Sequence, residues 1–161
     1  MHERAKALIA ELGLEPHPEG GYYKQVFRSL TSVTRTSDAK ERRALTAIYF
    51  LLAKGGSASA RKSRWHCVTS DEIWTHVEGG VITLWRFDGD AAYATRLGSL
   101  QQDASPFLVV PANVWQAAEL EDDYALIACF VAPGFEFDDF TLAADETASV
   151  RMLPRELRRL V

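Results

Sequence analysis

The residues best suited to chemistry lie close together in the sequence, between positions 63 and 80. This run holds His66, Glu72, Trp74 and His76, and its pattern predicts a strand, a turn and a second strand. Because alternate side chains of a strand share a face, Glu72, Trp74 and His76 are expected to point the same way. An imidazole and a carboxylate that face one space suit a metal site, an acid/base pair or a polar ligand pocket. The alternative is that Trp74 fills a core and the polar groups lie at its rim.

A second set of candidate residues lies in the run 16–23, where prolines and glycines interrupt regular structure. His17 and Glu19 project from this loop, and Tyr22 and Tyr23 follow it directly. The loop is either a plain connector or a wall of a site. We favour the wall, because either tyrosine could present its phenol to a ligand.

The elements that must position these residues are mostly short strands. Apolar residues at helical spacing predict a helix over 3–12, and a proline and two leucines predict a short helix over 154–160. The polar stretch 31–41 reads as a surface loop, and the phenylalanine-rich stretch 133–140 as an edge strand or a flap. The remaining apolar runs predict strands over 22–29, 44–52, 57–68, 81–87, 91–97, 107–110, 114–120 and 124–132. Many short strands with a helix at each end predict an all-β fold, and we expect an antiparallel jelly roll.

The composition indicates an ordinary globular protein. A chain of 161 residues with 47% hydrophobic residues suits a single domain over 1–161, with a barrel core at about 20–142. A net charge of −4 argues against a nucleic-acid partner. No apolar run reaches the roughly 20 residues of a membrane helix, and the N-terminus has no apolar core of a signal peptide. Cys67 and Cys129 lie in apolar runs and read as buried free thiols, so we expect a cytoplasmic protein.

The central stretch resembles the first motif of the cupin superfamily. That motif has two histidines two residues apart, then a glutamate and a glycine. His66, Glu72 and Gly79 stand at the first, third and fourth of these positions, and Val68 stands at the second histidine.

The second cupin motif resembles the run 111–116, in which Asn113 stands where glycine is usual and Gln116 replaces the last histidine. Four runs in the same order are similar to one small, functionally uncharacterised branch of the cupins. These runs are 16–23, 70–74, 110–116 and 131–140. The resemblance implies a cupin jelly roll (a double-stranded β-helix) that is commonly a homodimer.

The resemblance also implies that His66, Glu72 and Gln116 converge inside the barrel. These three residues are candidate ligands for a divalent zinc, manganese, iron or nickel ion, with His76 as a substitute ligand. Against a metal, amide oxygen is a weak ligand for zinc, and Val68 removes a donor. The alternative is that His66 and Glu72 hydrogen-bond to each other, which would raise the pKa of the histidine.

Three classes of function remain open from the sequence. The first is an acid/base enzyme of the isomerase or epimerase type, acting on a sugar or nucleotide derivative; metal-free cupin epimerases are the analogy. In this reading His66 acts as the base near Glu72, and Tyr22, Tyr23 or Tyr49 acts as the acid. The second is a non-catalytic module that binds a small molecule, and the third is a storage protein. The candidate ligand-binding residues are Glu19, Tyr22, Trp74, His76, Trp115 and Gln116.

Overall fold

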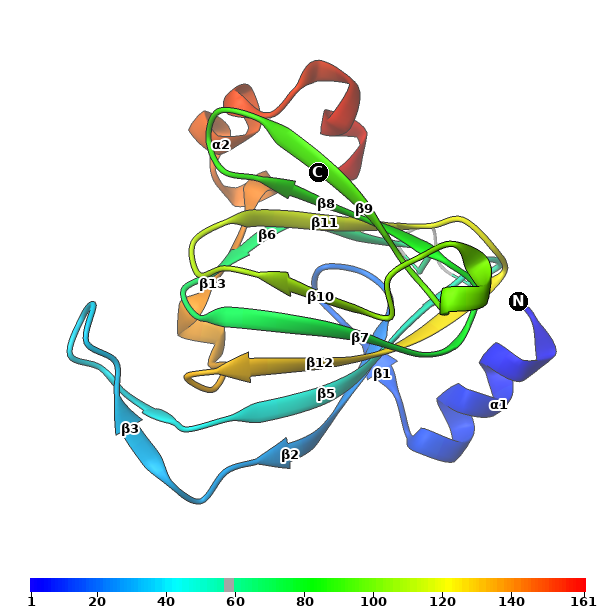
Figure 1. Ribbon diagram of the computed structural model, residues 1–161, viewed down its shortest axis with the longest axis horizontal. Helices are drawn as coiled ribbons and strands as arrows, with labels where there is room; N and C mark the ends of the chain where they lie inside the picture. The colour runs from blue at the N-terminus through cyan, green and yellow to red at the C-terminus, as the bar shows by residue number, and fades with distance from the viewer. Residues whose placement is uncertain (57–59) are drawn as a thin grey trace.

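The computed structural model, which describes residues 1–56 and 60–161, contains two large antiparallel β-sheets (Figure 1). The six-stranded sheet has the order β1 (Glu15–Pro16), β2 (Tyr22–Arg28), β5 (Thr46–Ala53), β12 (Tyr124–Ala132), β7 (Asp71–Gly79) and β10 (Phe107–Val110). The five-stranded sheet has the order β13 (Phe140–Leu142), β6 (Lys62–Val68), β11 (Trp115–Leu120), β8 (Ile82–Phe87) and β9 (Ala92–Leu97). The predicted all-β jelly roll is confirmed.

The main core lies between these sheets because alternate side chains of each strand turn inward. Phe50 and Trp74 come from the six-stranded sheet, and Leu84 and Leu120 come from the five-stranded sheet. Complete burial of a side chain of this kind contributes roughly 1.5–3 kcal/mol to folding. The core fills one part of the space between the sheets and leaves the candidate site in the other.

The predicted N-terminal helix is α1 (Glu3–Leu12), which ends at Gly13 in the left-handed conformation. Its Ala5 and Leu8 pack against Leu51 and Leu126 on the outer face of the six-stranded sheet.

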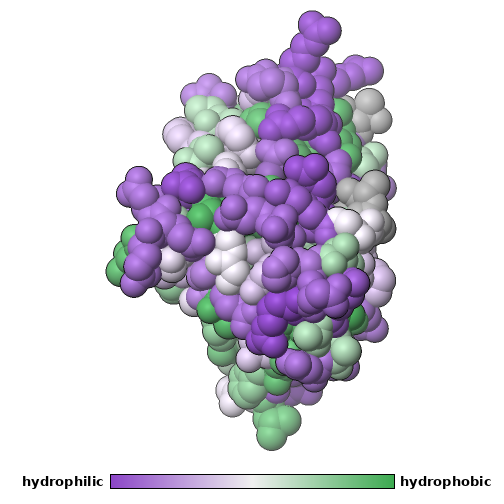
Figure 2. All heavy atoms as spheres, turned by 90° about the vertical axis from the view of Figure 1, so that its right-hand side faces the viewer, coloured by the Kyte–Doolittle hydropathy of each residue, from purple (hydrophilic) through white to green (hydrophobic). Residues whose placement is uncertain are grey.

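Hydrophilic residues cover most of the face of the molecule shown in Figure 2, and hydrophobic residues gather at its lower end.

The C-terminal segment covers the outer face of the five-stranded sheet (Figure 1). It contains α2 (Thr147–Met152) and a 3₁₀ helix, η4 (Arg155–Leu160), at the position of the predicted short helix. Leu157 of η4 packs near Trp65, whose indole N–H donates to the Leu157 carbonyl oxygen at 3.0 Å. Two further 3₁₀ turns are η1 (Leu100–Gln102) and η3 (Ala143–Asp145). In the described part of the chain, neither α-helix has the length and apolar character needed to span a membrane.

The stretch 31–41, predicted as a surface loop, contributes to a two-stranded hairpin that projects from the body (Figure 1). Its strands are β3 (Ser32–Thr34) and β4 (Glu41–Arg43). Strands of three residues with largely polar, accessible side chains show no hydrophobic alternation, so the sequence gives no sign of them. The strand predicted over 57–68 begins at Lys62 in the structure, and residues 57–59 of that prediction lie outside the described residues.

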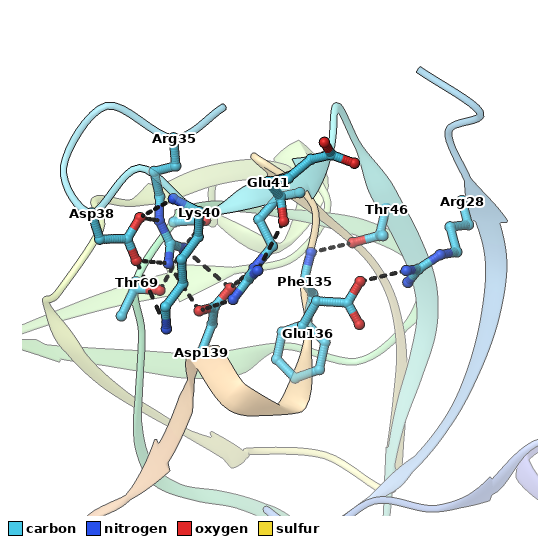
Figure 3. A network of polar contacts seen from close by, with 12 residues as sticks. Arg28, Arg35, Asp38, Lys40, Glu41, Thr46, Thr69, Phe135, Glu136 and Asp139 are labelled. Atoms are coloured by element: carbon cyan, nitrogen blue, oxygen red, sulfur yellow. Dashed lines mark hydrogen bonds and ion pairs between the residues drawn. The ribbon is translucent and has the colours of Figure 1, made fainter. Parts of the chain in front are cut away.

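Residues 133–140, which we call the flap, include the 3₁₀ turn η2 (Phe137–Asp139) and are fastened to the hairpin (Figure 3). Asp139 is buried and accepts paired hydrogen bonds from two guanidinium groups. Arg35 Nη2 lies 2.9 Å from Asp139 Oδ1, and Arg42 Nε lies 2.6 Å from Asp139 Oδ2. The two arginines hold the pKa of Asp139 well below its usual range. This clamp matters because the flap forms one wall of the cavity described below.

Asp139→Asn is expected to lower the free energy of unfolding by about 3 kcal/mol, because it leaves buried Arg35 without one of its carboxylate partners. Urea unfolding followed by tryptophan fluorescence measures the change. Asp138→Asn, at the exposed neighbouring carboxylate, is the matched control and should change the free energy of unfolding by less than about 0.5 kcal/mol. Small and equal effects of the two variants would contradict the clamp.

Candidate functional site

A cavity of about 340 Å³ lies between the sheets, where the loop before β2 meets the flap. Its lining includes two carboxyl groups, from Glu19 and Glu72, and two imidazoles, from His17 and His66. Aromatic rings from β2, β5 and the flap complete much of the wall, and Val68 adds an apolar side chain to it. The cavity therefore joins an aromatic enclosure to a cluster of titratable groups.

Glu19 reaches the cavity because its loop folds tightly against β5 and β6. Gly20 and Gly21 both have positive φ, at 113° and 67°, which glycine adopts without strain. A Cβ atom on Gly21 would lie 2.8 Å from the Leu51 carbonyl oxygen, so no side chain fits there. The Arg64 backbone N–H donates to the Glu19 carbonyl oxygen at 2.7 Å, which ties the loop to β6. The Glu19 side chain is buried as a result.

Glu19, Ser63 and His66 form one hydrogen-bonded group. Ser63 Oγ donates to Glu19 Oε1 at 2.8 Å, and His66 Nε2 lies 3.3 Å from Glu19 Oε2. His66 Nδ1 donates to the Arg64 carbonyl oxygen at 2.8 Å, which fixes the proton of a neutral His66 on Nδ1. The unprotonated Nε2 of His66 therefore faces the Glu19 carboxyl.

Glu72 belongs to a second chain of hydrogen bonds that crosses between the sheets. The Trp74 indole N–H donates to Gln116 Oε1 at 3.0 Å, and Gln116 Nε2 donates to Glu72 Oε2 at 2.6 Å. The Cys129 thiol also lies near Glu72 and favours its ionised form. Trp74 thus orients Gln116, and Gln116 in turn holds the Glu72 carboxyl in place.

Burial controls the protonation of the whole cluster because it disfavours every charged form. It raises the pKa of Glu72 to about 7 and also raises the pKa of Glu19. It lowers the pKa values of His66 and His17. The expected direct hydrogen bond between His66 and Glu72 is not the arrangement here, because His66 faces Glu19. The nearby Glu72 charge favours protonation of His66, but burial outweighs it.

His17 lies among aromatic rings at the side of the cavity. The edge of its ring meets Tyr23 at a centroid distance of 4.6 Å, and Phe140 lies 5.9 Å away. Its Nδ1 accepts the Glu19 backbone N–H at 3.3 Å and lies 3.5 Å from Glu19 Oε2. The loop therefore supplies a wall of the cavity as well as one of its carboxyl groups.

The predicted ligand set does not suit a metal ion in this arrangement. Gln116 turns its amide nitrogen toward Glu72, and its oxygen accepts the Trp74 N–H, so the amide offers no oxygen to an ion next to Glu72. His66 Nε2 faces Glu19. Within residues 1–56 and 60–161, no group of three or more histidine, cysteine, aspartate or glutamate side chains is placed to hold a metal.

Three other predicted site residues lie on the outer faces of the sheets. Tyr22 and Tyr49 pack in the cluster beneath α1, because β2 and β5 turn their alternate side chains outward at these positions. Trp115 packs beneath the C-terminal segment for the same reason, since its neighbour Gln116 points inward. None of the three lines the cavity.

His76 and Tyr23 occupy different places on the inner side. His76 pairs with the core residue Ile127, so it shares the inward face of β7 with Glu72 and Trp74, as expected. Trp74 stands between Glu72 and His76 along the strand, and His76 does not line the cavity. Tyr23 does line the cavity, and burial together with the nearby Glu15 carboxylate raises the pKa of its phenol. The raised pKa makes the Tyr23 phenol a poorer proton donor than an ordinary tyrosine, which counts against its predicted role as the acid.

Ser63 and Cys129 take part in the site but were not predicted from the sequence. Ser63 and His66 are three residues apart, so simple alternation would put them on opposite faces. A β-bulge in β6 brings both inward, since Gln116 pairs with His66 while Ala118 pairs with Ser63. Cys129 reaches Glu72 through the pairing of β12 with β7. No local pattern in the sequence signals either the bulge or that pairing.

Known structures resemble this chain over nearly its whole length. A hypothetical protein from Leishmania major has a TM-score of 0.82 and 26% identity, over 98% of each chain. A protein from Shewanella oneidensis has a TM-score of 0.74 and 31% identity, over 94% of this chain and 97% of that one. Oxalate decarboxylase from Bacillus subtilis has a TM-score of 0.58 at 14% identity, over 88% of this chain and 32% of that one, which shows a shared fold alone.

Comparison of the sequence with curated proteins gave no match. Residues 6–143 match the family described as "Cupin superfamily (DUF985)". That match covers most of the chain, including the loop, the first and second motifs and the flap. The chain belongs to this family of the cupin superfamily.

Proposed function

We propose that the protein is an acid/base enzyme that moves a proton on a small polar molecule bound in the cavity, as an isomerase or epimerase does. One observation carries the proposal: burial brings the pKa of Glu72 to about 7 at the edge of an accessible cavity. A general acid or base works best when its pKa lies near the operating pH. Strongly shifted groups gathered in a cavity are typical of catalytic sites.

Two groups of residues would carry out the two proton transfers. Ionised Glu72, held by Gln116, accepts a proton from a C–H bond of the substrate. Glu19 and His66 form the second unit, in which the shifted pKa values of both groups favour the proton on Glu19. This unit donates a proton to the substrate, so one proton is taken and one is returned. Ser63 and the Arg64 carbonyl oxygen hold the unit in position.

A non-catalytic binding module is the second candidate function. It is favoured by the fact that the polar groups of the site hydrogen-bond to one another, as in the chain from Trp74 through Gln116 to Glu72. Such a network can serve as the fixed polar floor of a ligand pocket. The two candidates differ in whether the bound molecule is chemically changed.

Proton transfer predicts exchange of a substrate hydrogen with solvent. A panel of aldoses, ketoses and nucleosides is incubated with the protein in D₂O, and proton NMR follows each C–H signal. At least one compound should lose a C–H signal, and Glu72→Gln should slow that loss by about 100-fold or more, because the variant cannot accept the proton.

Glu78→Gln is the matched control for this experiment, since Glu78 is a carboxylate of the same strand that pairs with Arg4 outside the cavity. It should exchange at the wild-type rate. Binding of a panel compound without any exchange would contradict the enzyme and favour the binding module. Exchange at equal rates in wild type and Glu72→Gln would contradict the role of Glu72.

The raised pKa of Glu72 also predicts how stability depends on pH. The unfolded chain releases this proton at a lower pH than the folded protein does, so the folded state loses stability as the pH rises. Relative to Glu72→Gln, wild type should lose up to about 3 kcal/mol as the pH rises from the ordinary value of 4.5 to about 7, and then stay level. Urea unfolding at a series of pH values measures the difference.

Glu78→Gln again supplies the control, here with the opposite sign. Arg4 lowers the pKa of Glu78, so wild type should lose stability relative to this variant as the pH falls through the acid range. If the free energy of unfolding changed with pH in the same way for wild type and Glu72→Gln, the prediction of a raised Glu72 pKa would be contradicted.

A further inference from the structure

We infer that the ligand of this cavity is a flat ring bearing a cationic nitrogen group, of the amidine or amino-heterocycle class. The inference rests on the proposed function because it concerns the same cavity. It narrows the class of ligand, since an anionic sugar or nucleotide derivative would place its negative charge beside two buried carboxyl groups.

The polar floor of the cavity is rich in acceptors. Its donors are already engaged with protein atoms: Ser63 donates to Glu19, His66 donates to the Arg64 carbonyl oxygen, and Gln116 donates to Glu72. An ionised carboxylate has lone pairs for about four hydrogen bonds, so ionised Glu72 retains acceptor capacity toward a ligand beside its bond from Gln116. Glu19 Oε1 accepts from Ser63 and retains a second lone pair even when Glu19 is protonated. A ligand that brings its own N–H donors therefore matches this floor.

Fixed positive charge is scarce in the described lining of the cavity. Among the described lining residues, Lys24 is the one lysine or arginine, and its side chain is exposed to solvent. Binding of a buried phosphate or carboxylate calls for arginine, lysine or a group of backbone N–H donors. An anion at the floor would instead lie beside two carboxyl groups. Arg64 is close enough for its charge to act on Glu19, but its guanidinium donates to the Pro18 carbonyl oxygen and it does not line the cavity.

The walls suit a flat cation. Phe50, Phe137 and Phe140 surround the cavity, and the His17 ring stacks toward Phe137 with a centroid distance of 6.3 Å. Aromatic faces attract cations and stack with planar groups. A cavity of about 340 Å³ is at the small end of ligand pockets, which suits one or two fused rings.

Charge neutralisation explains how the cation and Glu72 would complement each other. Titratable groups near Glu72 come from three other elements: His66 on β6, Glu19 on the loop and Cys129 on β12. None of them carries a stable positive charge in the buried cluster, since burial lowers the pKa of His66. A bound cation would supply that charge, so Glu72 would ionise and release its proton as the cation enters.

Three compounds of one shape test the inference: cationic benzamidine, neutral benzamide and anionic benzoate. Titration calorimetry at pH 6, in two buffers with different ionisation enthalpies, gives both affinity and protons released. Benzamidine should bind at least about tenfold more tightly than benzoate. Its binding should release close to one proton at pH 6, because Glu72 is then protonated in the free protein, and close to none at pH 8.5.

Glu72→Gln should lose the proton release and most of the preference for the cation, while Glu78→Gln should keep both. Equal or tighter binding of benzoate would overturn the inference, and so would failure of benzamidine to bind. The outcome is separate from that of the proposed function. Binding of benzamidine with proton release, but no hydrogen exchange on any panel compound, would support this inference and count against the enzyme. Hydrogen exchange that depends on Glu72, in a protein that does not bind benzamidine, would support the enzyme and overturn this inference.

Discussion

The removal of Glu72 and Glu19 from water is the constraint on which the rest of this site depends. A carboxylate buried without a partner is costly, so burial pushes both groups toward their neutral forms and raises their pKa values. The protein offsets part of this cost with fixed donors, which are Gln116 for Glu72 and Ser63 for Glu19. The balance leaves Glu72 able to gain or lose a proton near neutral pH.

Elements far apart in the sequence together shield the cluster of Glu19, His66 and Glu72 from water. The glycine-rich loop turns Glu19 inward, and the bulge in β6 places Ser63 and His66 on one face. The flap closes a wall with its phenylalanine rings, and Asp139 fastens it to the hairpin through Arg35 and Arg42. The clamp lies outside the cavity and positions the flap wall that encloses it.

Much of the fold could be predicted from the sequence because hydrophobic alternation and turn residues are local signals. The helix over 3–12 and the strands over 107–110 and 124–132 have the observed bounds. The cupin motifs also correspond to local backbone needs. Asn113, which stands where glycine is usual, has a φ of 65°, a left-handed conformation that asparagine tolerates better than most residues.

The site was less predictable because it depends on how strands pair. His66, Glu72, Glu19 and Tyr23 line the cavity, whereas Tyr49 was predicted inside and lies beneath α1. A nearly continuous apolar strand such as β5 does not reveal which of its faces turns inward. The partner of His66 was equally hidden, since Glu19 lies 47 positions earlier in the chain and only the folded loop brings the two together.

The titration of Glu72 shows directly whether burial brings its pKa near neutrality. Glutamate labelled with ¹³C at the side-chain carboxyl gives one NMR signal for each residue, and the signal missing from Glu72→Gln identifies Glu72. This signal should titrate with a midpoint near pH 7. A midpoint near the ordinary value of 4.5 would contradict it, because Glu72 would then be a solvated carboxylate at neutral pH, poorly suited to exchange a proton there.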